Sequence, residues 1–108
     1  LDSFVARRRE IVKQYFEKLD NSLLPYQHPD TNSSWHLFVI KINNRKEIFK
    51  KLKELSVNSQ VHYIPVNTQP FYNRNKLKNS DDFYQHCLSL PIYPNLTNEE
   101  QLIVLSCL

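Results

Sequence analysis

One stretch of thirteen residues is the most informative part of this chain: Gln60-Val61-His62-Tyr63-Ile64-Pro65-Val66-Asn67-Thr68-Gln69-Pro70-Phe71-Tyr72. It contains two prolines, three aromatic residues and one histidine. Each proline fixes its own φ angle, removes a backbone donor and restricts the residue before it, so the stretch cannot form one long helix or strand. We predict a short strand over residues 60–64 that ends at Pro65, followed by a rigid, irregular loop.

The polar side chains of this loop make it a candidate binding site. His62 and Tyr63 lie where the predicted strand ends, and Asn67, Gln69 and Tyr72 follow between or beside the prolines. A rigid loop with hydrogen-bonding groups and aromatic faces suits a sugar or nucleotide ligand. We therefore expect these five residues to bind substrate. The alternative is a hydrogen-bonded structural loop that closes the edge of the sheet.

Outward from this stretch, the spacing of apolar residues predicts four helices and three short strands. In chain order these are a helix over about 3–21, a strand over 35–42, a helix over 45–55, the strand over 60–64, a helix that starts at Ser80-Asp81-Asp82, an extended piece over 89–92 and a helix after Thr97. The strand over 35–42 is apolar on both faces, which predicts a central place in its sheet. The expected fold is α+β: one domain over 1–108 in which helices cover a small three-stranded sheet.

Local sequence signals refine these boundaries. Thr97 followed by Glu100 forms a capping-box pattern, and Asp2 or Ser3 is a candidate cap for the first helix. The chain contains no glycine, so a turn with positive φ must use another residue. Asparagine tolerates that conformation best, which makes Asn58 the expected left-handed residue after the helix over 45–55.

The composition excludes several classes of protein. Without glycine there is neither a P-loop nor a dinucleotide-binding fingerprint. The longest apolar runs are far shorter than a bilayer requires, and the N-terminus does not have the pattern of a secretory signal, so we expect a cytoplasmic protein without a membrane partner. Cys87 and Cys107 lack metal-ligand spacing, and the histidines are scattered, so we expect free thiols and no metal site.

Four segments in order resemble the C-terminal part of the DegT/DnrJ/EryC1/StrS family of sugar aminotransferases: Leu1–Glu10, Ser34–Ile40, His62–Tyr72 and Leu88–Gln101. The third is most similar to family members that make 4-amino sugars for pseudaminic acid. The resemblance implies the small C-terminal domain of a fold-type I aminotransferase. Ser56 and Asn58 stand where members of the family commonly have glycine, and Asn67 stands where many have histidine.

The resemblance also implies an activity that this chain does not carry alone. In such enzymes pyridoxal phosphate, held on a lysine of a large domain, takes an amino group from glutamate. The amino group passes to a 4-keto-6-deoxy sugar nucleotide, and the enzyme is a homodimer. The large domain would precede Leu1. The first residue is not methionine, and we expect a fragment without catalytic residues of its own. None of its nine lysines is a candidate for the Schiff base.

Two other readings stay open. One is a free-standing module that binds a nucleic acid or a protein, because basic helices and aromatic residues accompany a small sheet. The net charge is only +3, and acidic residues lie among the basic ones, which counts against nucleic acid. The other is a fragment that folds and binds nothing. For the isolated domain we expect an exposed apolar patch along Phe4, Val12 and Tyr15. For Arg7-Arg8-Arg9 we expect a solvated or interdomain role, with contact to a phosphate as the alternative.

Overall fold

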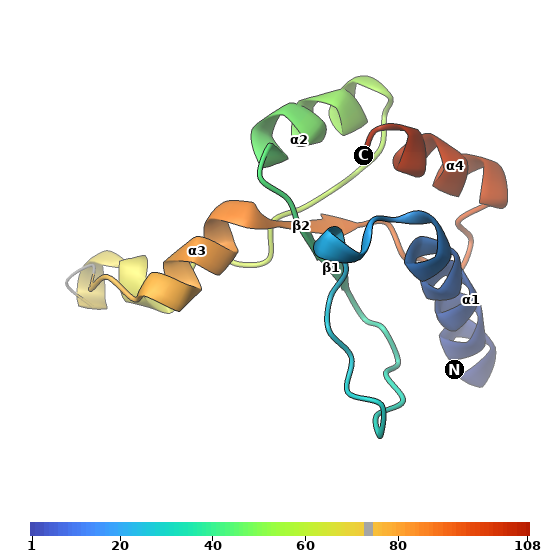
Figure 1. The fold of residues 1–108 in the computed structure, drawn as a ribbon, viewed down its shortest axis with the longest axis horizontal. Helices are drawn as coiled ribbons and strands as arrows, with labels where there is room; N and C mark the ends of the chain where they lie inside the picture. Colours follow the sequence, from blue (N-terminus) through green and yellow to red (C-terminus); the bar gives the residue numbers. More distant parts are fainter. Residues whose placement is uncertain (73–74) are drawn as a thin grey trace.

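The computed structural model describes residues 1–72 and 75–108, and this part of the chain contains four α-helices and a two-stranded antiparallel sheet (Figure 1). Strand β1 (Phe38–Lys41) pairs with β2 (Cys87–Leu90), with Phe38 opposite Leu90 and Ile40 opposite Leu88. The helices are α1 (Asp2–Lys18), α2 (Arg45–Glu54), α3 (Lys78–His86) and α4 (Asn98–Ser106). The α+β class expected from the sequence is confirmed.

The core lies where α1 and α4 pack against each other and against the sheet (Figure 1). Tyr15 of α1 and Phe38 of β1 are fully buried and stack with ring centroids 4.8 Å apart. Phe16 and Trp35 pack edge-on or tilted against the Phe38 ring. Both faces of the sheet contribute, because every residue of β2 is buried. The helical period of α1 and the apolar content of both strands therefore explain why these elements meet here.

The capping box predicted at Thr97 is confirmed. The Thr97 hydroxyl accepts a hydrogen bond from the Glu100 backbone N–H at 3.2 Å, and the Glu100 carboxylate accepts one from the Thr97 N–H at 2.8 Å. These bonds satisfy backbone donors that the first turn of a helix leaves free.

We expect Thr97→Ala to lower the free energy of unfolding by about 1 kcal/mol, because the substitution leaves the Glu100 N–H without its cap. Urea denaturation followed by far-ultraviolet circular dichroism measures the change. Thr97→Ser, which keeps the hydroxyl, is the matched control and should retain most of the stability. Equal losses in the two variants would show that the methyl group, rather than the cap, is what matters.

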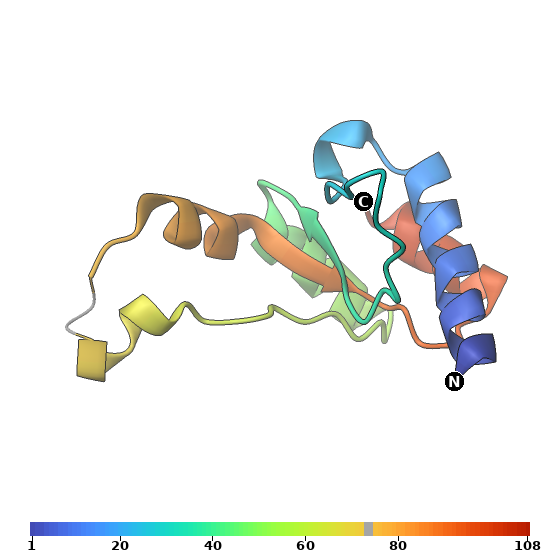
Figure 2. The ribbon, with the colours of Figure 1, turned by 90° about the horizontal axis from the view of Figure 1, so that it is seen from below.

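The predicted three-stranded sheet is wrong in one strand. The segment after Gln60 contributes a single bridge to β2, in which the Ser89 N–H donates to the Gln60 carbonyl at 2.8 Å. Beyond that bridge the chain leaves β2 on its way to Pro65, so no further pairs form (Figure 2). The strand predicted over 35–42 is also shorter, because Trp35 has φ 51° and lies outside the strand. β2 pairs with β1 on one side and with Gln60 on the other, so β2 is the central strand. The prediction that the strand over 35–42 is central is therefore wrong.

Several predicted boundaries and faces also change. Helix α1 ends at Lys18 and has no side-chain cap at its start, so the expected cap from Asp2 or Ser3 is wrong. Val12 and Tyr15 face the core, which leaves only Phe4 (58% exposed) of the apolar patch expected on α1. Helix α3 begins at Lys78, before the predicted start at Ser80, although the Asp81 carboxylate does reach back to accept from the Leu77 N–H at 3.1 Å.

The left-handed residue after α2 is Ser56, with φ 59°, and not Asn58. The helix ends at Glu54, and the Val57 N–H returns to the Leu52 carbonyl at 2.8 Å. This hydrogen bond closes the turn tightly and requires a positive φ at the second residue after the helix, which is Ser56 and not Asn58. A side chain with a Cβ is unfavourable in that conformation.

Ser56→Gly should therefore raise the free energy of unfolding by roughly 0.5–1 kcal/mol, since relief of the left-handed strain exceeds the added entropy of glycine in the unfolded chain. The measurement is the shift of the thermal and urea transitions. Asn58→Gly is the control, because Asn58 does not have a positive φ, and it should be neutral or destabilising. If Ser56→Gly is destabilising as well, the conformation of this turn is not limiting.

A long excursion leaves the body of the molecule between the bridge at Gln60 and β2 (Figures 1 and 2). We call it the arm: residues 61–72 and 75–86. It contains two short 3₁₀ turns, Val66–Thr68 and Pro70–Tyr72, and helix α3, which leads directly into β2. The Lys41 ammonium on β1 contacts the Asp82 carboxylate of α3 at 2.7 Å, which ties the arm to the sheet. None of the helices in the described part of the chain is long and apolar enough to cross a membrane.

Candidate functional site

The five residues predicted to bind substrate all lie on the arm, but the structure does not bring them into one cluster. His62 is at the base of the arm, beside β2. Its Nδ1 lies 2.8 Å from the Ser89 hydroxyl and its Nε2 lies 2.8 Å from the Gln60 side-chain oxygen. Both ring nitrogens are thus engaged within the chain. His62 holds the start of the arm against β2, and it can contact a ligand only through its ring face or by exchanging one of these bonds.

Asn67 is engaged inside the arm. Its side-chain amide donates to the Asn75 carbonyl at 2.6 Å and to the Asp81 carboxylate at 3.1 Å. Since Asp81 also caps the start of α3, this pair joins the first 3₁₀ turn to that helix. The arrangement supports the structural alternative for Asn67: the side chain shapes the arm.

Tyr63, Gln69 and Tyr72 are directed toward solvent. Tyr63 is 71% exposed and Tyr72 is 50% exposed, and between them Phe71 is 85% exposed. These aromatic faces make few contacts with the core, although the Phe71 and Tyr72 rings pack edge-to-face on each other at 5.2 Å. Exposed aromatic residues on an ordered segment are typical of a region that contacts a ligand or another protein.

At the base of the arm, His62 lines a pocket of about 210 Å³. The pocket also receives side chains from α1, from the segment before β1 and from the chain after β2. The ten lining residues are mostly polar: Arg8, His36, Leu37, Asn58, Gln60, His62, Ser89, Leu90, Ile92 and Tyr93. No carboxylate is among them.

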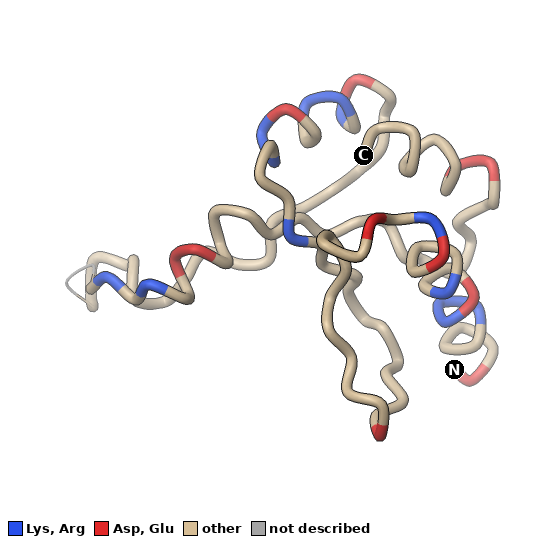
Figure 3. The backbone as a smooth tube through the Cα atoms, viewed as in Figure 1, with Lys and Arg blue, Asp and Glu red and all other residues tan. Residues whose placement is uncertain are grey.

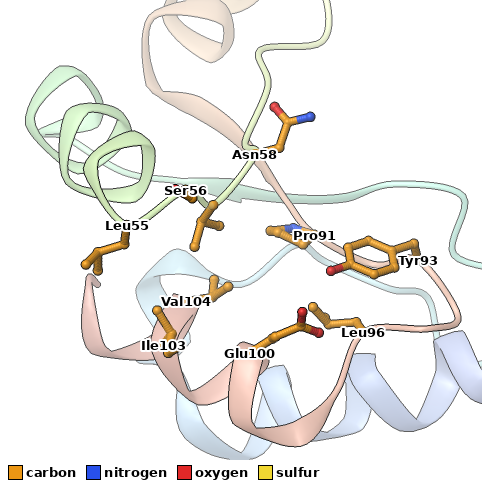
Figure 4. Close-up of a pocket in the computed structure, with 10 residues that line it drawn as sticks. Leu55, Ser56, Asn58, Pro91, Tyr93, Leu96, Glu100, Ile103 and Val104 are labelled. Carbon is orange, nitrogen blue, oxygen red and sulfur yellow. The ribbon is translucent and has the colours of Figure 1, made fainter.

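A second pocket, of about 320 Å³, lies between the end of α2, the chain after β2 and α4 (Figure 4). It is mainly apolar, with Leu55, Pro91, Leu96, Ile103 and Val104 on its walls. Its polar side chains are those of Ser56, Asn58, Tyr93 and Glu100. Burial, and then the nearby Glu100 carboxylate, raise the pKa of the Tyr93 phenol, so Tyr93 stays neutral and able to donate at physiological pH.

The charged side chains are distributed over the surface with both signs mixed (Figure 3). On α2, Lys51 lies 3.4 Å from Glu47 and Lys50 lies 3.8 Å from Glu54. Such pairs stabilise a solvated helix face. Among the described residues no group of three or more His, Cys, Asp or Glu side chains is placed to hold a metal.

The chain by itself does not fit pyridoxal phosphate. That cofactor needs a lysine inside a cavity for its Schiff base, and all nine lysines of this chain are exposed. A lysine lines neither of the two pockets described above, and on α2 Lys50 and Lys51 pair with glutamates.

Sequence reasoning missed the residues that build the pocket at the base of the arm. Arg8 was considered only as part of a basic run, and Gln60, Ser89 and Tyr93 were not singled out. They come from segments far apart in the chain, and no local motif joins them. The signal available was the alternation in β2, which places Ser89 between the apolar Leu88 and Leu90.

Comparison with known proteins identifies the relatives of this fold. The whole chain, residues 1–108, matches the DegT/DnrJ/EryC1/StrS aminotransferase family. It is 32% identical over 114 residues to a dTDP-3-amino-3,4,6-trideoxy-alpha-D-glucose transaminase of Streptomyces venezuelae, and the match covers 97% of this chain and 30% of the relative.

Solved structures show the same architecture. The S. venezuelae protein DesV, in complex with a ketimine intermediate, superposes with a TM-score of 0.89 at 30% identity, over 98% of this chain and 31% of DesV. Helicobacter pylori PseC, an aminotransferase involved in the biosynthesis of pseudoaminic acid, gives a TM-score of 0.80 at 28% identity, over 96% of this chain and 31% of PseC. The chain thus spans about 30% of the length of the relatives it matches. The resemblance seen in the sequence is confirmed: the chain belongs to the DegT/DnrJ/EryC1/StrS aminotransferase family.

Proposed function

We propose that this chain acts as the small C-terminal domain of a pyridoxal-phosphate-dependent nucleotide-sugar aminotransferase. The reaction would move an amino group from glutamate to a 4-keto-6-deoxy sugar nucleotide. The cofactor and its lysine would belong to a large domain that precedes Leu1, so the 108 residues alone would be inactive. The working enzyme would be a cytoplasmic homodimer. Family membership supports the reaction class, and the names of the transaminase and of PseC support a sugar substrate.

The observation that carries this proposal is the arm. Its aromatic residues are exposed, yet its base is fixed: Gln60 bridges to β2, His62 is bonded on both ring nitrogens, and α3 is tied to β1. Ordering a segment like the arm costs conformational entropy, and the arm buries few side chains in the core that would offset this cost. An ordered surface with exposed aromatic side chains is expected where one domain forms a wall of a binding site together with another domain. On this view Tyr63, Gln69 and Tyr72 face the substrate, while His62 and Asn67 position them.

The first test concerns the gene. The nucleotide sequence upstream of the codon for Leu1 should contain an open frame of about 250 residues, because this chain of 108 residues spans about 30% of the length of its relatives. That frame should encode a lysine in an aminotransferase setting. A start codon directly before Leu1 would overturn the proposal and leave a stand-alone binding module.

The second test concerns the arm in the enzyme encoded by that frame. Tyr63→Phe and Gln69→Ala should each lower kcat/KM for a UDP-4-keto-6-deoxy sugar with glutamate by about tenfold, the effect of one lost hydrogen bond to substrate. Tyr26→Phe is the matched control, because Tyr26 is 83% exposed on a different loop, and its kcat/KM should not change. Arm variants that behave like Tyr26→Phe would contradict the assignment of these residues.

A further inference from the structure

Three consecutive arginines on α1 have different environments. Arg7 contacts Glu10 at 3.0 Å and donates to the Leu96 carbonyl at 2.7 Å. Arg9 donates from its Nε to the Ser33 carbonyl at 3.1 Å. Arg8, between them, forms no ion pair within residues 1–72 and 75–108, and its Nε is covered by protein but has no hydrogen-bond partner there. The middle arginine is therefore the one whose guanidinium remains available.

Arg8 lines the pocket at the base of the arm, and the other polar groups in that pocket are amides, hydroxyls and imidazoles. The Glu100 carboxylate lines the neighbouring pocket instead. The two pockets share Asn58 and Tyr93, and the Asn58 side chain is directed away from α4 (Figure 4). The residues that line the Arg8 pocket thus include an arginine and several hydrogen-bond donors, and none of them is a carboxylate.

This arrangement is unfavourable when the pocket holds only solvent. Partial burial removes water from a guanidinium, and a charged group loses more by that than a neutral one unless a counter-charge compensates. The planar guanidinium fork matches the oxygens of a carboxylate or phosphate, and charge-assisted hydrogen bonds of this kind are the strong ones. An oxyanion would supply both the missing charge and the missing acceptors.

We infer that the pocket at the base of the arm binds a small oxyanion, a carboxylate or a phosphate group, with Arg8 as its counter-ion. Asn58 and His36 are the neighbouring donors that complete the site. At about 210 Å³ the pocket is smaller than the 300–1,000 Å³ typical for a drug-sized ligand, so it accommodates one charged group and not a whole nucleotide sugar. His62 is a wall of the site, since both of its ring nitrogens already have partners.

The site is independent of the proposed transaminase reaction, because it lies wholly within this chain and requires no cofactor. It also gives the rigid base of the arm a role of its own. An anion bound to Arg8 would contact residues of α1, the bridge at Gln60 and the chain after β2, and would stabilise their relative positions.

The test is a titration of the full 108-residue chain, labelled with ¹⁵N, in which the Nε–H signals of the arginines are followed. One titration uses inorganic phosphate as the probe and a second titration uses glutarate, and each probe is exchanged against chloride at constant ionic strength. A saturable shift of the Arg8 signal is expected. Saturation by phosphate alone identifies a phosphate site, and saturation by glutarate alone identifies a carboxylate site.

Variants separate this site from general screening of charge. Arg8→Gln should weaken binding by about 10- to 100-fold, the range expected for a charge-assisted hydrogen bond, and Arg8→Lys should recover part of it. Arg9→Gln removes the same charge one residue away, where the side chain already has a partner, and should leave the affinity unchanged. In the Arg8 variants binding is read from the backbone amides of Asn58 and Gln60, with retained signal dispersion as the check on folding. Linear shifts with both probes, or equal effects of the Arg8 and Arg9 variants, overturn the inference.

Discussion

Phe38→Ala should lower the free energy of unfolding by about 3–5 kcal/mol, as is typical when a fully buried phenylalanine is truncated. Phe38 is 0% exposed, and its ring contacts three others: Tyr15 at 4.8 Å, Phe16 at 5.9 Å and Trp35 at 5.8 Å between centroids. Those rings come from α1 and from the segment before β1. The cavity would therefore open at the place where helix and sheet meet.

Because a loss of this size approaches the whole stability of a small domain, the experiment includes Phe38→Leu, which should lose less because it keeps part of the buried volume. Guanidinium denaturation measures both variants. Phe71→Ala is the control: Phe71 is 85% exposed on the arm, and its truncation should change stability by less than about 0.5 kcal/mol. A comparable loss at Phe71 would mean that the arm folds as part of the core.

Tyr15→Phe should cost about 1–3 kcal/mol at neutral pH, although it removes only one oxygen. The Tyr15 hydroxyl donates to the Pro91 carbonyl at 2.9 Å, and without it that partly buried acceptor loses its side-chain donor. The bond joins α1 to the chain just after β2. Its loss is measured by urea denaturation, and Tyr26→Phe, at an exposed tyrosine, should be neutral.

The same residue predicts a dependence on alkaline pH. Burial raises the pKa of the Tyr15 phenol, and the nearby Tyr93 raises it further. Because the pKa in the folded state exceeds the value of about 10 in an unfolded chain, the stabilisation is complete below pH 10 and is lost as the pH rises toward the folded-state pKa. The wild-type chain should lose stability above about pH 10 more steeply than Tyr15→Phe does. Parallel curves for the two proteins would contradict this role of Tyr15.

Local patterns predicted well where the determinants lie close together in the chain. The capping box depends on Thr97 and Glu100, three residues apart, and it forms as expected. The helices were found because the 3.6-residue period places Ile11 and Tyr15 on one face of α1. The predictions were wrong where a structure depends on contacts between segments that are distant in the sequence. A third strand was predicted from the composition of residues 60–64, but pairing depends on the path of the chain relative to β2, and only Gln60 follows it.

The candidate site divides in the same way. Local sequence indicated that His62–Tyr72 would be a rigid, aromatic segment, and the structure shows a fixed base with exposed rings. It did not indicate that the Asn67 amide would donate a hydrogen bond to Asp81, fourteen residues later. It also did not indicate that Ser56, instead of Asn58, would have the left-handed backbone conformation. Each outcome depends on the geometry of a closure, which residue propensities alone do not specify.

The sequence by itself determined the family, the α+β class, the four helices and the absence of a glycine-rich phosphate loop, because motif order, hydrophobic period and composition are properties of the chain. Only the tertiary structure decided that β2 is central, that the arm leaves the core, and that Arg8 meets Asn58 and Tyr93 in one pocket. The physical reason is that burial and charge compensation are set by groups that are distant in sequence and adjacent only after packing. Arg7, Arg8 and Arg9 are identical in type and consecutive in the chain, and the fold alone provides partners for the outer two and leaves the middle one facing a pocket.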